Sequence, residues 1–191
     1  LERRGIQLFG NSPALGIKPH HVTTPEGSLT ARHVVRATEA YTSQLPGHRR
    51  TVIPLYSLMV ATEPLPKNVW DELGWSQRTT FADGRNMVTY AQRTADGRIA
   101  FGGRGAPYHF GSAIHHRFDE DRPIHGKIEK TVRRLFPQIG DAHFTHRWGG
   151  PLAASRDWHP FATYDRLQSD DSSSTATWTL GGQAQCIHGI F

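Results

Sequence analysis

The strongest constraint on the fold is a pair of strand-like segments joined by a short turn. The segments NMVTYAQRT (86–94) and RIAFGG (98–103) flank Ala95-Asp96-Gly97. Asp-Gly is typical of tight hairpin turns, because both residues tolerate the left-handed backbone that such turns need. The sequence therefore predicts an antiparallel β-hairpin here.

Further strands are predicted on both sides of this hairpin. Residues 5–36 look like short strands with turns, in which GIQLF (5–9) and LTARHVVRA (29–37) are strand-like and PEGS (25–28) is a turn. The apolar run TVIPLYSLMVATEPL (51–65) predicts a longer strand, with Pro54 at its start or on a sheet edge. ATWTLGG (176–182) predicts the last strand.

One segment has helical periodicity. Over residues 119–137 the apolar positions Ile124, Ile128, Val132, Leu135 and Phe136 recur at helical spacing, and Pro137 ends the pattern. A helix packed on a sheet is the natural interpretation. Because strands dominate and strand–helix units do not repeat, we expect an α+β fold, with an antiparallel-rich sheet covered by one helix.

The bulk properties favour a cytoplasmic protein without a membrane span. The chain has 191 residues, 37% hydrophobic, and a mean hydropathy of −0.53. Its longest apolar runs are too short to cross a bilayer, and LERRGIQLFG lacks the apolar core of a signal peptide. Cys186 is the only cysteine, which excludes an internal disulfide and a Cys-rich zinc site.

The net charge of +5 raises the possibility of a nucleic-acid partner. The basic residues are nevertheless scattered as isolated pairs with acids between them, and no nucleic-acid-binding motif accompanies them. A solvated basic surface is the better explanation, and we expect no nucleic-acid partner.

Several common site motifs are absent. A dinucleotide-binding GxGxxG that began at Gly103 would need glycine at position 108, where Tyr108 stands, and no helix pattern follows. The Gly102–Gly105 cluster therefore suits a hairpin or a bend. The twelve histidines include no HExxH, so we expect no metal site. No GxSxG elbow supports hydrolysis.

The segment THRWGGPLAASRDWHP (145–160) has the composition of a site. Trp148 offers a broad apolar face and one N–H donor, and Gly149 and Gly150 allow close approach of a flat group. Arg156-Asp157 follows in the same segment. From these residues alone, lining a site and filling a core are equally acceptable roles.

These motifs together resemble the FAD-dependent oxidoreductases of the D-amino-acid oxidase and glycine oxidase family, and most closely its gamma-glutamylputrescine oxidase-like branch. VIPLYSLMVATEPLP, TYAQRTADGRIAFGGRG and LFPQIGDAHFTHRWGG occur in the family's order, and the resemblance covers nearly the whole chain. It implies FAD as the cofactor and oxidation of a C–N bond in an amine or amino acid. The alternative is a non-catalytic β-rich binding module, which would show no visible flavin absorption.

The resemblance also implies roles for individual residues. Trp148, Gly149 and Gly150 would lie beside the flavin and the substrate. Ala37-Thr38 would mark the step where the chain passes the cofactor, and Gly181-Gly182 would match a flavin-contacting segment. Arg156 and Asp157 match the family's Arg-Asp step, where a structural ion pair is slightly favoured over substrate contact.

One position bears on the substrate. In the family's amino-acid oxidases, an arginine two residues after the second glycine clamps the substrate carboxylate. Leu152 stands there in this chain, and Arg104 is the residue that could replace the clamp.

Three departures from the family pattern suggest an incomplete piece of a flavoenzyme. The nucleotide-binding GxGxxG is absent, Glu39 replaces the usual glycine after Ala-Thr, and the end GGQAQCIHGIF matches only at Gly181-Gly182. We expect parts of a FAD-binding domain at 1–42 and 158–191, and a substrate domain at 43–157.

Overall fold

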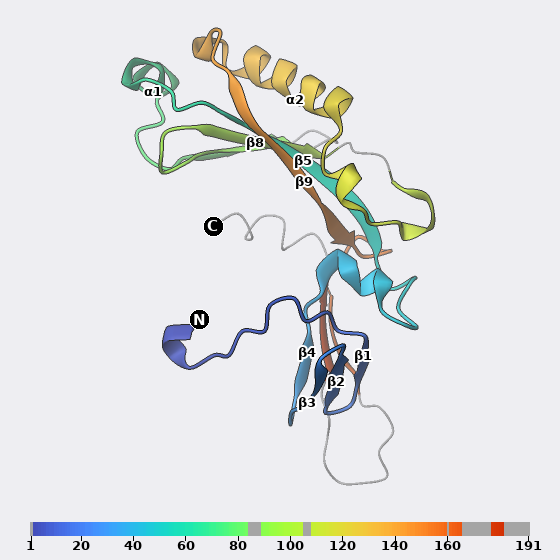
Figure 1. Cartoon of the computed structure of the whole chain (residues 1–191). Coiled ribbons are helices and arrows are strands. Elements are labelled where there is room, and N and C mark those ends of the chain that lie inside the picture. The colour runs from blue at the N-terminus through green and yellow to red at the C-terminus, as the bar shows by residue number, and fades with distance from the viewer. Residues whose placement is uncertain (1, 84–88, 105–107, 160, 166–176, 182–191) are drawn as a thin grey trace. The chain divides into compact units, whose positions relative to one another are not determined.

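The computed structural model describes residues 2–83, 89–104, 108–159, 161–165 and 177–181. The chain divides into two compact units. Unit 1 combines Leu1–Ile53 with Ala153–Phe191, and unit 2 is the continuous stretch Pro54–Leu152. Figure 1 shows the whole chain.

Unit 2 is built around a five-stranded sheet in the order β6-β7-β8-β5-β9. Its strands are β5 (Ile53–Thr62), β6 (Thr80–Ala82), β7 (Thr89–Arg93), β8 (Ile99–Arg104) and β9 (Phe144–Ala154). The predicted hairpin is confirmed as β7 and β8, which pair antiparallel from Thr89↔Gly103 to Arg93↔Ile99. Pro54 lies at the start of β5, which is an interior strand, so the sheet-edge alternative is wrong.

The strand β9 runs antiparallel to β5. The Glu63 N–H, just after β5, donates to the His143 carbonyl, just before β9, at 2.7 Å. The end of β5 therefore lies beside the start of β9. Together with the antiparallel pairs β5–β8, β7–β8 and β6–β7, this confirms the predicted antiparallel-rich sheet of an α+β fold.

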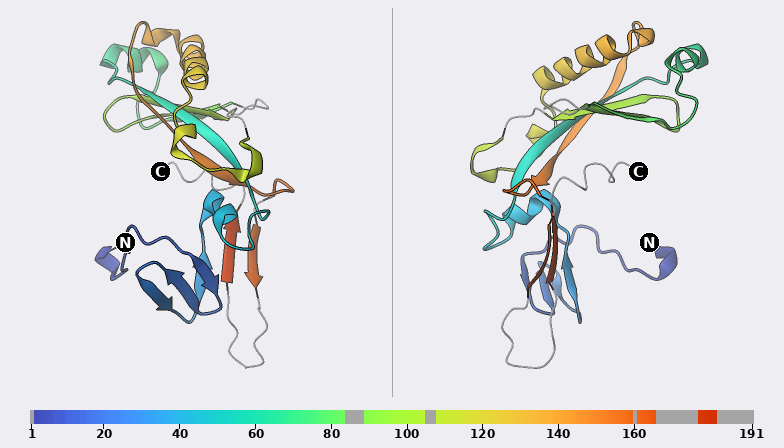
Figure 2. Two further views of the ribbon diagram at one scale, coloured as in Figure 1. Left: turned by 45° about the vertical axis from the view of Figure 1, so that its right-hand side comes forward. Right: turned by 180° about the vertical axis from the view of Figure 1, so that it is seen from behind.

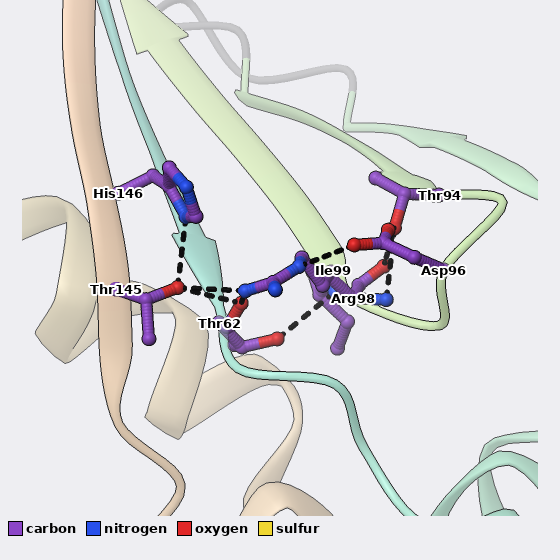
Figure 3. A network of polar contacts seen from close by, with 7 residues as sticks. All are labelled: Thr62, Thr94, Asp96, Arg98, Ile99, Thr145 and His146. Carbon is purple, nitrogen blue, oxygen red and sulfur yellow. Dashed lines mark hydrogen bonds and ion pairs between the residues drawn. The ribbon is translucent and has the colours of Figure 1, made fainter.

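A polar network joins the ends of three strands of this sheet (Figure 3). The Arg98 guanidinium donates through Nη1 to the Thr62 carbonyl at 3.0 Å and to Thr145 Oγ1 at 2.8 Å, and through Nε to Asp96 at 2.6 Å. Thr62 Oγ1 accepts from the Ile99 N–H at 3.0 Å. The hairpin turn is thereby tied to both β5 and β9.

The predicted helix is confirmed as α2 (Arg122–Leu135). It begins where the Asp121 carboxylate accepts from the Ile124 N–H at 3.0 Å, which satisfies one free donor of the first turn. Its Ile128 and Val132 are buried, as the periodicity predicts. The short helix α1 (Lys67–Leu73) was not predicted, because seven residues hold too few turns to show a period.

Both α-helices of the described residues cover the same face of the sheet (Figures 1 and 2). They and the 3-10 turn η5 (Pro137–Ile139) form one buried cluster with the sheet, which includes Leu58 and Val60 of β5, Ile99 and Phe101 of β8, and Trp70 of α1. These aliphatic and aromatic side chains supply the apolar burial that stabilises unit 2.

Unit 1 holds two small sheets. The first is an antiparallel meander of β1 (Gly16–Lys18), β2 (His21–Thr24) and β3 (Gly27–Thr30), with the predicted turn between β2 and β3. The predicted strand over residues 5–9 is wrong, because this segment pairs with no described strand. Its Ile6, Leu8 and Phe9 are exposed, so they have no apolar face to bury against within the described residues.

The second sheet has the order β10-β11-β4, with β4 (Val34–Arg36), β10 (Phe161–Asp165) and β11 (Thr177–Gly181). The predicted last strand is confirmed as β11, which pairs parallel to β4 and antiparallel to β10. The remaining short turns are η1 (Glu2–Arg4), η2 (Glu39–Gln44), η3 (Phe110–Ser112) and η4 (His116–Phe118).

Some sequence predictions fall outside the described residues. Gly105 of the predicted bend and Gly182 of the implied flavin-contacting segment belong to this group. Among the helices that the structure describes, none combines the length and apolarity that a membrane crossing needs. The same residues contain no group of three His, Cys, Asp or Glu side chains that could hold a metal ion.

Candidate functional site

The face of the sheet opposite the helices carries a polar site. In a strand, successive side chains point to opposite faces. Since Leu58 and Val60 point into the core with the helices, Ser57 and Met59 lie on the other face. Neither of the described helices of unit 2 covers this side of the sheet, and we call it the open face.

A hydroxyl pair spans three strands of the open face. Tyr90 of β7 places its Oη 2.5 Å from Ser57 Oγ of β5, and β8 lies between these strands. Gly102 of β8 makes this reach possible, because a Cβ there would lie 2.5 Å from the Tyr90 ring. Ser57 is buried and Tyr90 is half-buried. The predicted bend is wrong for Gly102 and Gly103, which lie in the regular strand β8, and Gly105 lies outside the described residues. Gly102 instead makes room for the Tyr90 ring.

The strand β9 adds Trp148 to the same face. Arg147 pairs with Glu129 of α2 at 2.7 Å, so its side chain points to the helices. A Cβ on Gly149 would overlap the Leu58 side chain, so this position also points to the core. Trp148 lies between these two residues, and alternation directs its indole to the open face, where it is 38% exposed.

Three other predicted residues lie on strands of the same sheet: Gly150 and Leu152 on β9, and Arg104 on β8. Gly150 follows on β9, and a Cβ added there would meet no described atom within 4 Å, so the position leaves space for a neighbouring group. Leu152 is half-buried on β9, in the same alternation phase as Trp148. The backbone of Arg104 lies opposite Ser57 in the β5–β8 register.

In unit 1 the Ala37-Thr38 step lies between β4 and η2, and it is followed by Glu39, which stands where the family usually has glycine. Its φ is +48°, in the left-handed region where glycine is favoured. Its Oε2 accepts from the Ala153 N–H at 2.6 Å and from the Ala40 N–H. Burial raises the pKa of the Glu39 carboxyl, and the two backbone hydrogen bonds oppose that shift. The carboxylate thus joins the start of η2 to the end of β9.

The Arg156-Asp157 pair has structural contacts, but each residue has a different partner. Arg156 Nε donates to the Arg50 carbonyl at 2.6 Å. Asp157 Oδ1 accepts from the His159 N–H at 3.1 Å, and this backbone hydrogen bond is the main cause that lowers the pKa of Asp157. These contacts hold the turn after β9. Gly181 ends β11, with its backbone opposite Phe161.

Sequence reasoning missed Tyr90, Ser57 and Gly102 as a group. A signal was present, because the Asp-Gly hairpin fixes a register in which Tyr90 lies opposite Gly102. A large ring opposite a glycine across a strand pair indicates that the ring lies over the glycine. The link to Ser57 depends on β5 pairing with β8, which lies 37 residues or more away in sequence and which the hairpin does not predict.

The chain matches the family described as DAO, FAD dependent oxidoreductase, over residues 1–178. It therefore belongs to this family of FAD-dependent oxidoreductases. FAD is the family's cofactor, as the sequence resemblance implied.

Two curated relatives are each named probable oxidoreductase OrdL. The protein of Haemophilus influenzae is 25% identical over 157 residues, which are 78% of this chain and 33% of the relative. That of Rhizobium meliloti is 28% identical over 162 residues, which are 82% of this chain and 35% of the relative. The chain thus spans about a third of the length of the curated relatives that it matches.

Solved structures of the same fold include two oxidases. Glycine oxidase from Geobacillus kaustophilus superposes with a TM-score of 0.67 at 17% identity, over 92% of this chain and 44% of that one. A fructosyl peptide oxidase from Aspergillus nidulans gives a TM-score of 0.70 at 15% identity, over 95% and 47%. At these identities the likeness establishes the fold, which agrees with the predicted α+β class.

Proposed function

We propose that this chain forms part of an enzyme that uses FAD to oxidise a C–N bond in an amine or amino acid. The observation that carries the proposal is the open face of unit 2, where a tyrosine–serine hydroxyl pair and a half-exposed tryptophan share one side of a sheet in a chain of the FAD-dependent family. FAD, when bound, accepts the hydride, so the protein needs few acid–base groups. Its residues have to bind and orient the substrate and exclude water.

The described residues fit part of such a cofactor. A Cβ at Gly150 would meet nothing within 4 Å, and the Trp148 indole offers a broad apolar face, which together suit a flat ring system. We assign substrate binding to residues 43–157, with Trp148, Leu152 and Arg104 as candidate residues, and FAD binding mainly to residues 1–42 and 158–191, with Gly149 and Gly150 bordering the flavin from the substrate domain. Ala37, Thr38, Gly149, Gly150, Gly181 and Gly182 are the candidate cofactor-binding residues that the resemblance implies.

In this proposal two side chains of the open face bind different parts of the substrate. Trp148 packs against the carbon skeleton of the substrate, and the Tyr90 hydroxyl, held by Ser57, hydrogen-bonds its polar end. Tyr90 is oriented before a substrate arrives, because Ser57 is buried and Gly102 fixes the ring. Preorganised hydrogen-bonding groups lose less freedom on binding than mobile ones.

Leu152 favours amines over simple α-amino acids. Leucine offers no hydrogen-bond donor, and a carboxylate placed against it would lose its water without compensation. This preference is in keeping with the gamma-glutamylputrescine oxidase-like branch that the sequence resembles. A substrate whose carboxylate lies far from the oxidised carbon would be accepted equally well.

The substrate experiment uses a full-length protein of the family that contains this chain. We expect a higher kcat/KM for putrescine-like diamines than for glycine and D-alanine. Trp148→Phe and Tyr90→Phe should each lower kcat/KM or shift the visible flavin spectrum, whereas the matched control Trp158→Phe, in the turn after β9, should change neither. A strong preference for the α-amino acids, or unchanged kinetics in both site variants, would contradict this assignment.

A second experiment tests whether the chain is a piece of a larger flavoenzyme. The pyrophosphate of FAD is usually held at a helix N-terminus that follows a glycine-rich turn. The sequence contains no such motif, so we expect purified chain to leave the fluorescence of added FAD nearly unchanged. Stoichiometric binding at micromolar FAD would show that the chain needs nothing more to hold the cofactor. A flavin-free full-length protein, without visible absorption, would favour the binding-module alternative.

A further inference from the structure

A buried histidine of α2 meets the strand that carries Trp148. His125 is only 1% exposed, although histidine is a polar residue. It lies in the first turn of α2, where its backbone N–H donates to the Asp121 carbonyl at 2.9 Å. A buried polar ring needs hydrogen-bond partners to offset the loss of water.

The partner of the ring is a main-chain carbonyl. His125 Nε2 lies 3.2 Å from the Trp148 carbonyl oxygen. A carbonyl only accepts hydrogen bonds, so Nε2 must carry the proton. β9 is an edge strand of the sheet, and carbonyls on the outer side of an edge strand need partners from outside the ladder. His125 supplies a side-chain partner from α2 for the Trp148 carbonyl.

The next residue is packed too closely to move independently. A Cβ at Gly149 would overlap Leu58 Cδ2 and would lie 3.1 Å from the carbonyl oxygens of Asp119 and Ser57. The chain entering α2, the strand β5 and the strand β9 therefore approach each other at Gly149. The His125 hydrogen bond and this close approach together restrict rotation of the peptide between Trp148 and Gly149.

We propose that His125 is a positioning residue, which holds the Trp148 carbonyl and thereby directs the Trp148 indole to the open face. This inference rests on the proposed function, in which Trp148 contacts the substrate. Without the donor, the Trp148 carbonyl loses its buried partner and the peptide can tilt. The indole on the open face then leaves its fixed direction, while the core on the helix side keeps its packing.

The first test observes the tautomer directly in the chain as it stands. In long-range ¹H–¹⁵N spectra, we expect the His125 ring to be in the Nε2–H form, with a slowly exchanging ring proton. A ring protonated only at Nδ1 would overturn the proposal, because Nε2 could not then donate to the carbonyl.

The second test compares two substitutions at position 125. His125→Gln keeps an N–H donor at about the position of Nε2, and His125→Leu removes it while keeping much of the volume. We expect the indole N–H signal of Trp148, identified with Trp148→Phe, to shift in His125→Leu and to stay close to its original position in His125→Gln. The matched control is His116→Asn, whose side chain is 97% exposed and which should leave the signal unchanged.

The indole signals of these variants decide whether His125 positions Trp148. An unmoved Trp148 signal in His125→Leu, or equal shifts in both variants, would overturn the proposal. If His125→Leu does not fold, the comparison of His125→Gln with the original chain decides it, because a preserved donor must preserve the indole signal.

The functional test is a double-mutant comparison in the full-length FAD-loaded protein. His125→Leu should raise KM for the amine by between about twofold and tenfold, as expected for one lost hydrogen bond. Added to Trp148→Phe, it should raise KM no further, because both changes act through the same indole. Additive effects would contradict the positioning role. If Trp148→Phe alone leaves the kinetics unchanged, the proposed function fails, while the spectra still report on His125.

Discussion

The two units of this chain differ in how far their described apolar residues form a shared core. Every residue of the main buried cluster belongs to unit 2, from Leu58 to Phe144. In unit 1, by contrast, large apolar side chains are exposed over both small sheets and the segment before them: Ile6, Leu8, Phe9, Leu15, Leu29 and Val35. Single exposed apolar residues are ordinary, and unit 2 also exposes Tyr108 and Phe110. The difference is that the described part of unit 1 buries a few apolar side chains, such as Leu45 and Val52, without a cluster like that of unit 2.

The contrast shows where the stability of the described structure comes from. Unit 2 is one continuous stretch that covers one face of its sheet with its own helices. Unit 1 joins two separate stretches, and its two sheets have three strands each. Apolar burial is the dominant favourable term in folding, so unit 2 should carry most of the free energy of unfolding.

The largest expected effect separates the units directly. Leu58→Ala removes a fully buried side chain from unit 2 and should lower the free energy of unfolding by about 2–5 kcal/mol. Leu29→Ala removes a side chain of unit 1 that is 48% exposed and should cost less than about 1 kcal/mol. Urea denaturation followed by circular dichroism measures both. Equal losses would show that unit 1 buries Leu29 in solution and that the contrast is wrong.

A smaller effect is expected within unit 2, at two adjacent glycines. Gly149→Ala forces a methyl group into Leu58 and should cost about 1–3 kcal/mol, as overpacking usually does. Gly150→Ala places the same methyl group in open space and should change stability by less than about 1 kcal/mol. Thermal unfolding of the two variants, side by side, gives the difference.

The combination of Gly149→Ala with Leu58→Ala sharpens this prediction. The shortened side chain at position 58 makes room for the new methyl group. The double variant should therefore lose less free energy of unfolding than the two single variants lose together. Full additivity would mean that Leu58 is not the group that excludes a side chain at position 149.

The smallest expected effect concerns pH and unit 1. Burial raises the folded-state pKa of Glu39 above its usual value of 4.5. Between the unfolded and the folded pKa the native state holds more protons, so stability from this group is present at low pH and falls as pH rises through that window. Glu39→Gln cannot ionise and should lack this fall. Unfolding free energies of both proteins from pH 4 upward, at about half-unit steps, test it.

The same measurement has an informative control. Glu63→Gln changes a partly exposed carboxylate just after β5 in unit 2, which accepts from the His143 N–H. If Glu39→Gln and Glu63→Gln give identical pH profiles, the burial of Glu39 has no effect on stability. If the free energy of unfolding of the original chain rises with pH relative to that of Glu39→Gln, the folded-state pKa of Glu39 is lowered and not raised, and the prediction is wrong.

Short-range sequence patterns were enough to predict the local elements. The Asp-Gly turn specified the β7–β8 hairpin, the spacing of Ile128 and Val132 specified α2, and the apolar run after Pro54 specified β5. Each depends on residues within a few positions of one another, so local backbone preference and periodicity suffice. The resemblance carried by the order of motifs supplied the family and the cofactor, which the match over residues 1–178 confirms.

The assembly of the candidate site, by contrast, depends on contacts between distant parts of the chain. Ser57, Tyr90 and Trp148 come from three strands, and they share a face because β5 pairs with both β8 and β9. Pairing between distant strands depends on which faces can be buried together, and no local pattern encodes it. The same reason explains Glu39 and His125, since each bonds to β9, 114 and 23 residues away in sequence. The residue types were visible in the sequence, but their partners were set by packing.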